Sequence, residues 1–284
     1  MKILAVPKIT NKQKEILNLL YTYRFLTRIQ IQTILKHKDK KTINLWLKDL
    51  RAKDYINWIY NKDHFAEKTK PAIYYLGRNG RRHIQNTDMY DREEIRKRYR
   101  EDERTQTFIN RSLLIADCCI ALRAAVDASK NSKSWYYYET EAIYRFSQSF
   151  YNFINNTEMI RPNLCFSKEQ DSGHGEAYTT DSYILEIFDA TLPRYRLRHR
   201  LNSYVGFLDE EGGWWQENTA TEQLPIILLV CASTTDLIYA KRLTRGLLRE
   251  IWDFGDDTRP RIRFTTIEKL RQHQVTAKEI WEQV

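Results

Sequence analysis

The order of structural signals in the first third of the chain constrains its fold more than any other feature. Thr10 with Gln13 and Thr27 with Gln30 have the spacing of a capping box, in which the two side chains bond the open backbone groups at a helix start. Apolar residues follow both signals at helical spacing. We therefore predict two consecutive helices that begin directly after the two threonines.

The first of these helices is expected over 11–23 and the second over 28–36. The second helix ends in a charged turn, "KHKDKK". We expect its apolar side chains to pack inward; these are Ile29, Ile31, Ile34 and Leu35.

A third helix is expected after Asp39, since Asp is favoured at the position that caps a helix start. Its apolar residues recur at the spacing of one buried stripe; they are Ile43, Leu47 and Leu50. That stripe turns the polar residues of the helix outward, together with one leucine. The outward set is Thr42, Asn44, Leu45 and Lys48.

Two strand-like runs complete the array. "YINWIY" (55–60) and "AIYYLG" (72–77) alternate as strands do, and a polar loop with several lysines joins them. Helices followed by a basic β-hairpin in this order are typical of a winged helix. We predict an N-terminal winged helix-turn-helix domain over 1–90, whose third helix would enter the major groove of DNA.

The positive charge of the chain is concentrated in this segment. Residues 1–86 hold 19 Lys and Arg against 6 Asp and Glu, a net charge of +13. The rest of the chain holds 27 against 31, a net charge of −4, which gives the net charge of +9 for the whole. Double-stranded DNA is the partner that such a basic module favours.

In a helix-turn-helix protein, early residues of the inserted helix meet base edges while flanking cations meet phosphates. We expect Asn44 to be the main base reader. The candidate DNA-binding residues are Arg28, Lys41, Thr42, Asn44, Lys48, Arg51, Lys62, His64, Lys68 and Lys70. Two other interpretations stay open: the lysines form a solvated face that keeps the protein soluble, or the winged helix docks a protein.

Several classes of protein are excluded by composition. No run of 18 apolar residues occurs, and the N-terminus lacks the pattern of a secretory leader, so we expect a soluble cytoplasmic protein that engages no membrane. The cysteines show no CxxC spacing and the histidines are scattered, which indicates reduced thiols and no metal site. The four cysteines are Cys118, Cys119, Cys165 and Cys231.

The middle of the chain changes character twice. Residues 88–104 are dense in charges of both signs and predict an exposed helix or linker. Residues 105–129 are apolar on nearly every face, which predicts a helix buried between two domains or in a dimer contact. We therefore expect a charged linker and a buried helix over 91–130, followed by a second domain over 131–284.

The C-terminal half alternates between strand-like and helix-like runs, which predicts an α/β domain around a central sheet. Strands are expected within 134–146, 159–166, 177–188 and 224–232, and helices over 194–208, 236–252 and 266–283. Acidic and polar residues stand at "IRPN" and "LEIFD", ahead of an arginine-rich helix. Carboxylates on neighbouring strands with a cation nearby can hold a divalent metal and polarise a phosphodiester.

These segments together resemble the plasmid replication-relaxation family of bacterial mobile elements. The resemblance covers about residues 10–250 and rests on the winged helix and on "YYLGRNGRR", "RPN", "LEIFDATLPRYRLRHRLNSY" and "LPIILLV". It implies an α+β protein in which the winged helix precedes an α/β domain of the restriction-endonuclease, or PD-(D/E)XK, fold. The implied nuclease positions are Pro162 with Asn163, Glu186 with Asp189, and Arg200 with Tyr204.

Two departures from the nuclease pattern indicate a domain without catalysis. Asn163 stands where the pattern has an acidic residue, and Phe188 stands where active nucleases have Lys. Arg200 does not replace that Lys, because a guanidinium does not exchange its proton at neutral pH. The degenerate catalytic set is Asn163, Glu186, Asp189 and Arg200.

The alternative to a non-catalytic domain is a metal-dependent endonuclease or nickase that the winged helix targets to DNA. Only this alternative requires Mg²⁺. Its metal site would be assembled from Glu139, Glu141, Glu158, Asp181, Glu186 and Asp189. A third interpretation pairs Glu186 and Asp189 with the arginine-rich helix in purely structural ion pairs.

Two further features have open interpretations. Trp214 and Trp215 lie in a Gly-flanked loop and either stack on a base or partner, or fold back as a local plug. One helix carries four cations that either track a phosphate backbone or form a solvated face; they are Lys241, Arg242, Arg245 and Arg249.

Taken together, the sequence predicts a sequence-specific or structure-specific DNA-binding protein of a plasmid, phage or integrative element. It would act in replication, transfer or their regulation. The expected partners are double-stranded DNA, a second copy of the chain, and replication or transfer proteins. No cofactor is expected.

Overall fold

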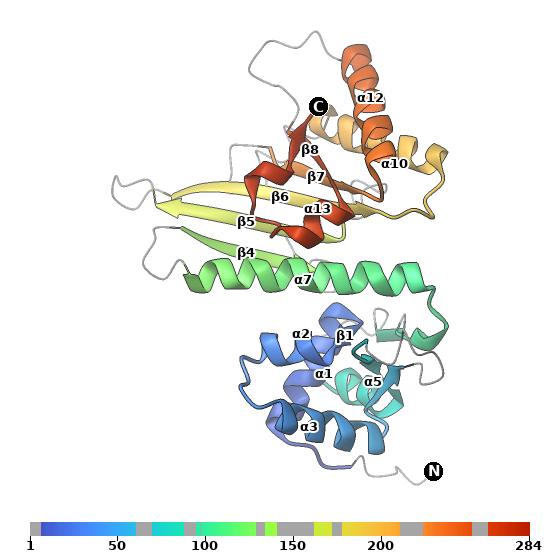
Figure 1. Cartoon of the computed structure of the whole chain (residues 1–284), viewed down its shortest axis with the longest axis vertical. Helices are drawn as coiled ribbons and strands as arrows, with labels where there is room; N and C mark the ends of the chain where they lie inside the picture. The colour runs from blue at the N-terminus through green and yellow to red at the C-terminus, as the bar shows by residue number, and fades with distance from the viewer. Residues whose placement is uncertain are drawn as a thin grey trace. The chain divides into compact units, whose positions relative to one another are not determined.

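The computed structural model describes residues 7–60, 70–87, 95–96, 98–128, 134–140, 162–171, 178–210, 224–251 and 261–284. The chain is a mixed α+β protein, as predicted, and divides into two compact units, Met1–Ile120 and Ala121–Val284 (Figure 1). The division falls within the long helix α7 (Gln106–Ala128).

In the described part of the first unit, helices and a small antiparallel sheet precede α7. The helices are α1 (Asn11–Tyr23), α2 (Arg28–Ile34), α3 (Lys40–Ala52) and α5 (Arg78–Gln85). The strands are β1 (Leu26–Thr27), β2 (Ile56–Ile59) and β3 (Ile73–Leu76), and they pair in the order β1-β3-β2. The predicted pairing of the two strand-like runs is confirmed, with Trp58 opposite Tyr74.

Both predicted capping boxes are confirmed, and each glutamine also links two helices. The Oε1 atom of Gln13 accepts a hydrogen bond from the backbone N–H of Thr10, and the Oε1 atom of Gln30 accepts one from the backbone N–H of Thr27. Through Nε2, Gln13 donates to Asp49 of α3 at 2.7 Å, and Gln30 donates to Asp117 of α7 at 2.7 Å. The residues that start α1 and α2 therefore also fix how these helices lie against α3 and α7.

The expectation that Ile29 packs inward is wrong, since 52% of its surface is exposed. Ile31 and Ile34 are buried as predicted. Successive helical residues are about 100° apart, so Ile29 and Ile31 lie on nearly opposite sides of α2. The end of the helix also falls earlier than expected, at Ile34.

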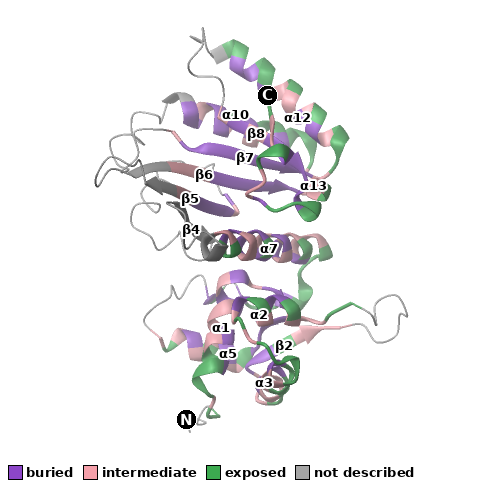
Figure 2. Ribbon diagram, turned by 60° about the vertical axis from the view of Figure 1, so that its left-hand side comes forward, coloured by how far each residue is buried: buried purple, intermediate pink, exposed green. Residues whose placement is uncertain are grey.

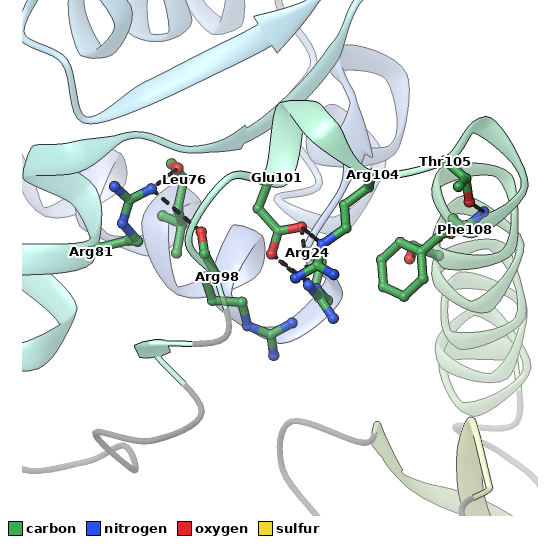
Figure 3. Close-up of polar contacts among 9 residues, drawn as sticks. Arg24, Leu76, Arg81, Arg98, Glu101, Arg104, Thr105 and Phe108 are labelled. Carbon is green, nitrogen blue, oxygen red and sulfur yellow. Dashed lines mark hydrogen bonds and ion pairs between the residues drawn. The ribbon is translucent and has the colours of Figure 1, made fainter.

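Part of the charged segment 88–104, predicted to be exposed, is instead buried. Glu101, only 2% exposed, lies in a 3-10 turn (Glu101–Glu103) and pairs with Arg24 at 2.8 Å and with Arg104 at 3.6 Å (Figure 3). Arg24 and Arg104 also lie over the ring of Phe108 in α7. Because Arg24 ends α1, this network ties the segment to the first helix.

Two glycines let α5 pack closely against the start of β2. A Cβ atom at Gly80 would meet the Tyr55 carbonyl oxygen, and one at Gly77 would lie 2.6 Å from the Asp54 carbonyl oxygen. Asn79 fixes the same contact by donating from Nδ2 to the Lys53 carbonyl oxygen at 2.8 Å. The "LGRNG" segment thus needs small residues for close backbone approach.

The second unit contains a six-stranded sheet in the order β4-β5-β6-β7-β8-β9. Its strands are β4 (Ser134–Thr140), β5 (Leu164–Asp171), β6 (Tyr178–Phe188), β7 (Ile226–Cys231), β8 (Ile262–Thr266) and β9 (Glu282–Gln283). β6, β7 and β8 run parallel, and the other neighbours are antiparallel. All of β7 is buried (Figure 2), as expected for a central parallel strand.

Helices α10 (Arg194–Glu210) and α12 (Thr234–Ile251) share one apolar core with the sheet. Leu201 of α10 and Ala240 of α12 pack there with Leu229 of β7 and Phe264 of β8. Short helices follow β8, at α13 (Ile267–Gln272) and Lys278–Ile280.

Two boundary predictions in this unit are wrong, and one strand was not predicted. The helix expected over 266–283 ends at Gln272, and the chain then returns as β9 beside β8. β8 itself was not predicted, and β5 starts at Leu164, later than expected. The end of this helix, the strand β8 and the start of β5 all depend on pairing with strands that are distant in the sequence. The periodicity of a short sequence window does not reveal such pairing.

All four cysteines are free and buried, as predicted. Burial raises the pKa of the Cys118 thiol to about 12, and the neighbouring Asp117 carboxylate adds to the rise. Burial also raises the pKa of the Cys119 and Cys231 thiols, so these three thiols are protonated at neutral pH and pack as small apolar groups.

Candidate nucleic-acid interface

The start of α3 is fixed by Asp39, as predicted. Its carboxylate accepts from the backbone N–H groups of Lys41 and Thr42, each at 2.9 Å, and from the Thr42 hydroxyl. The Thr42 hydroxyl bond and these backbone bonds lower the pKa of Asp39 below its usual 3.8. Thr42, a predicted DNA-binding residue, thus has its hydroxyl engaged in the helix cap.

The buried stripe of α3 is as predicted, and so is its outward face except for Thr42, which is only partly exposed. Ile43, Leu47 and Leu50 are buried, whereas Asn44 and Lys48 are exposed (Figure 2). Residues spaced by three, four and three positions share one side of a helix. The outward face defined by this spacing consists of Lys41, Asn44, Lys48 and Arg51. We call it the α3 face.

The α3 face carries cations and no carboxylate. Lys41 and Lys48 are exposed, and within the described part of the chain no carboxylate lies within ion-pair distance of either. Asp49, the one acidic residue of α3, points to another side and bonds Lys53 at 2.8 Å and Gln13 at 2.7 Å. These two bonds, Lys53 first, lower the pKa of Asp49.

Cations from two helices meet the hairpin at one end of this face. The Arg51 guanidinium lies 3.6 Å from the ring centroid of Trp58 in β2, and Trp58 lies beside Tyr74 in β3. Burial raises the pKa of Tyr74, while the charges of Arg51 and Arg28 oppose that rise. Arg28, on α2, bonds Gln32 at 2.6 Å and acts on Tyr74 through its charge.

The remaining predicted DNA-binding residues belong to the hairpin loop. Lys70 is exposed just ahead of β3. Lys62, His64 and Lys68 lie outside the described residues. Trp58, which the sequence analysis did not single out, could have been found from its place opposite Tyr74 on an alternating hairpin.

The degenerate nuclease residues lie in the second unit, where Glu186 is buried. It is 1% exposed and pairs with Arg200 of α10. Glu186 lies opposite Leu229 of β7, and Leu229 in turn lies opposite Phe264 of β8; both of these residues are apolar and buried. A carboxylate in such surroundings depends on its arginine for charge compensation. This is the ion pair that the structural interpretation of Glu186 predicted.

Asn163 and Asp189 also bond to protein groups. The Asn163 side-chain oxygen accepts from the Ile187 backbone N–H at 2.8 Å, which extends the pairing of β5 with β6. Asp189 accepts from the Thr191 backbone N–H at 3.0 Å, in the turn that leads to α10.

The residues of the alternative metal site are only partly described. Asp181 and Glu186 are five positions apart on β6, so their side chains lie on opposite faces of the sheet. Across the described ranges, no group of three or more His, Cys, Asp and Glu residues is arranged to hold a metal ion. Glu141, Glu158, Trp214 and Trp215 lie outside those ranges, as does the side chain of Glu139.

The four cations of α12 are not equivalent. Lys241 pairs with Glu282 of β9 at 3.2 Å. Arg242, Arg245 and Arg249 are exposed along one side of the helix. Only these three arginines therefore remain on a solvent-facing stripe.

Comparisons with known proteins bear on family but not on mechanism. A family model described as replication-relaxation matches residues 17–224. No curated protein and no solved structure matches the chain. None of the helices in the described ranges has the length and apolar character that a bilayer crossing requires.

Proposed function

The chain belongs to the replication-relaxation family, and from that membership we propose that it serves the replication or transfer of a plasmid or other mobile element by binding duplex DNA. The first unit is the DNA-binding part in this proposal. Its helices α1 to α3 and its β2–β3 hairpin would act as a winged helix, with α3 in the major groove and the hairpin against the backbone.

The single observation that carries this proposal is the α3 face. It combines an exposed asparagine with two exposed lysines that form no ion pair among the residues the structure describes, and Asp49, the acidic residue of α3, points to another side. Phosphates attract such cations, and an asparagine side chain can bond two atoms of one base edge. Arg51 and Arg28, held beside the hairpin aromatics, extend the positive surface towards the proposed wing.

The second unit is proposed to be a nuclease-like platform without catalysis. The order α7, β4, β5, β6, α10, β7, with β6 and β7 parallel, suits a restriction-endonuclease core. Asn163 and Glu186, however, serve strand pairing and an ion pair. We propose that this unit contacts a second copy of the chain or another replication or transfer protein. A homodimer would match DNA half-sites related by two-fold symmetry.

Electrophoretic retardation of duplex DNA tests the proposal. The double variant Lys41→Glu, Lys48→Glu reverses two exposed charges that have no ion-pair partner in the described ranges, so we expect a loss of affinity of at least tenfold at low salt. The control is Arg271→Glu, Lys278→Glu, which changes the net charge equally at exposed positions of the second unit. Equal affinities for wild type and the α3 double variant would refute the proposal.

A further inference from the structure

An exposed leucine stands among the cations of α3. Leu45 leaves 65% of its surface open, although it lies between Lys41 and Lys48 along the helix. Its neighbour Asn44 is also exposed. Because α3 already buries three apolar residues on its other side, Leu45 contributes nothing to the core. A molecule that binds this surface would have to accept both an apolar contact and positive charge.

The charge around Leu45 argues against a second copy of the chain as that partner. A two-fold contact through this surface would bring Lys41 and Lys48 of one copy against the same lysines of the other. Like charges facing each other in a contact are strongly unfavourable. A polyanion with exposed methyl groups fits the same surface without that penalty.

Duplex DNA offers this combination in its major groove. Thymine presents a C5 methyl group there, and adenine presents the N7 acceptor and the N6 donor that an asparagine amide bonds together. Asn44 and Leu45 are consecutive, so they lie about 1.5 Å apart along the helix axis and both reach the outward side. The surrounding lysines would contact the flanking phosphates.

We infer that α3 recognises A·T base pairs, with Asn44 bonding an adenine edge and Leu45 contacting the methyl group of a thymine. The inference rests on the proposed function, since it names the bases that the DNA-binding helix reads. Leu45 is then a specificity-determining residue.

A cycle of protein and DNA changes tests this inference. Duplexes that bind the wild-type protein are selected from a random pool, and each thymine of the selected site is replaced in turn by deoxyuridine, which lacks the methyl group. At one or two positions we expect wild-type affinity to fall about three- to fivefold, the value for one buried methyl group. The Leu45→Ala variant should bind the thymine and deoxyuridine duplexes equally.

The matched control is Ile29→Ala, which removes another exposed aliphatic side chain of the first unit. This variant should keep the deoxyuridine effect. In parallel, 7-deazaadenine removes the N7 acceptor, and its effect should disappear in Asn44→Ala. A methyl effect that persists unchanged in Leu45→Ala, or a selected site without thymine, overturns the inference while DNA binding stands. Failure to retain any duplex overturns the proposed function as well.

Discussion

Buried carboxylates in both units are compensated by arginines that come from distant positions. Glu101 bonds Arg24, 77 residues away, and Glu186 bonds Arg200 of the following helix. Removing one member of such a pair leaves a charge without compensation, whereas replacing both by apolar residues removes the cost of burying them. If the pair is purely structural, the double replacement should therefore be less destabilising than the removal of the arginine alone.

We therefore predict that Arg200→Leu destabilises the second unit by about 3 kcal/mol, because Glu186 keeps its buried charge. The double variant Glu186→Leu, Arg200→Leu should recover most of that loss. Urea unfolding of the three proteins, followed by circular dichroism, measures the coupling. A double variant as unstable as the sum of the single variants would contradict a structural role.

Asp49 gives a prediction about pH. Its pKa is lowered by the bond from Lys53 and then by the bond from Gln13, so its contribution to stability is present above pH 3.8 and is lost as the pH falls through the folded-state pKa. The difference in melting temperature between wild type and Asp49→Asn should therefore shrink below pH 3.8. Thermal melts between pH 6 and pH 2.5 measure it. The change of this difference with pH should be smaller when Lys53→Met is present in both proteins. A difference in melting temperature that does not depend on pH would refute this explanation.

At the level of elements, the close approach of α5 to β2 depends on Gly80. We predict that Gly80→Ala destabilises the first unit by about 3 kcal/mol, because the added Cβ meets a backbone carbonyl that has no room to move. Gly246→Ala in α12 is the control, since a Cβ there has no neighbour within 4 Å and should add about 0.5–1 kcal/mol of stability. Chemical denaturation measures both. A neutral Gly80→Ala would show that α5 does not pack as described.

The elements that the sequence predicts well are those whose signals are local. The capping boxes at Thr10 and Thr27 and the stripe of α3 lie within a few residues of one another, and all are confirmed. Ile29 was misplaced because a short helix gives a weak periodic signal. The burial of Glu101 depends on Arg24, and β8 and β9 depend on each other, so no local window reveals them.

The candidate site shows the same limit. The exposure of Asn44 and Lys48 follows from the helical period alone, and so could be predicted. The stacking of Arg51 on Trp58 joins α3 to β2, and the engagement of Thr42 by Asp39 depends on the detailed geometry of the cap. These contacts became visible only with the fold.

At the scale of the whole molecule, charge separates the two parts of the chain, since residues 1–86 carry a net +13 and the remainder a net −4. DNA affinity should therefore fall steeply with salt, by about one unit of logarithmic slope for each phosphate contact. We predict that Lys48→Ala lowers the slope by about one, whereas Lys278→Ala leaves it unchanged. Fluorescence anisotropy between 50 and 300 mM salt measures the slopes, and equal slopes for Lys48→Ala and wild type would show that Lys48 contacts no phosphate.

The most direct test of the central claim is photo-crosslinking from α3 to DNA. A photoreactive amino acid is introduced at position 48, on the α3 face, and in a second protein at position 271, on the other unit. If α3 lies in the groove, position 48 forms a covalent protein–DNA adduct and position 271 forms none. An adduct from position 271 alone, with position 48 unreactive in a protein that still binds the duplex, would contradict the claim.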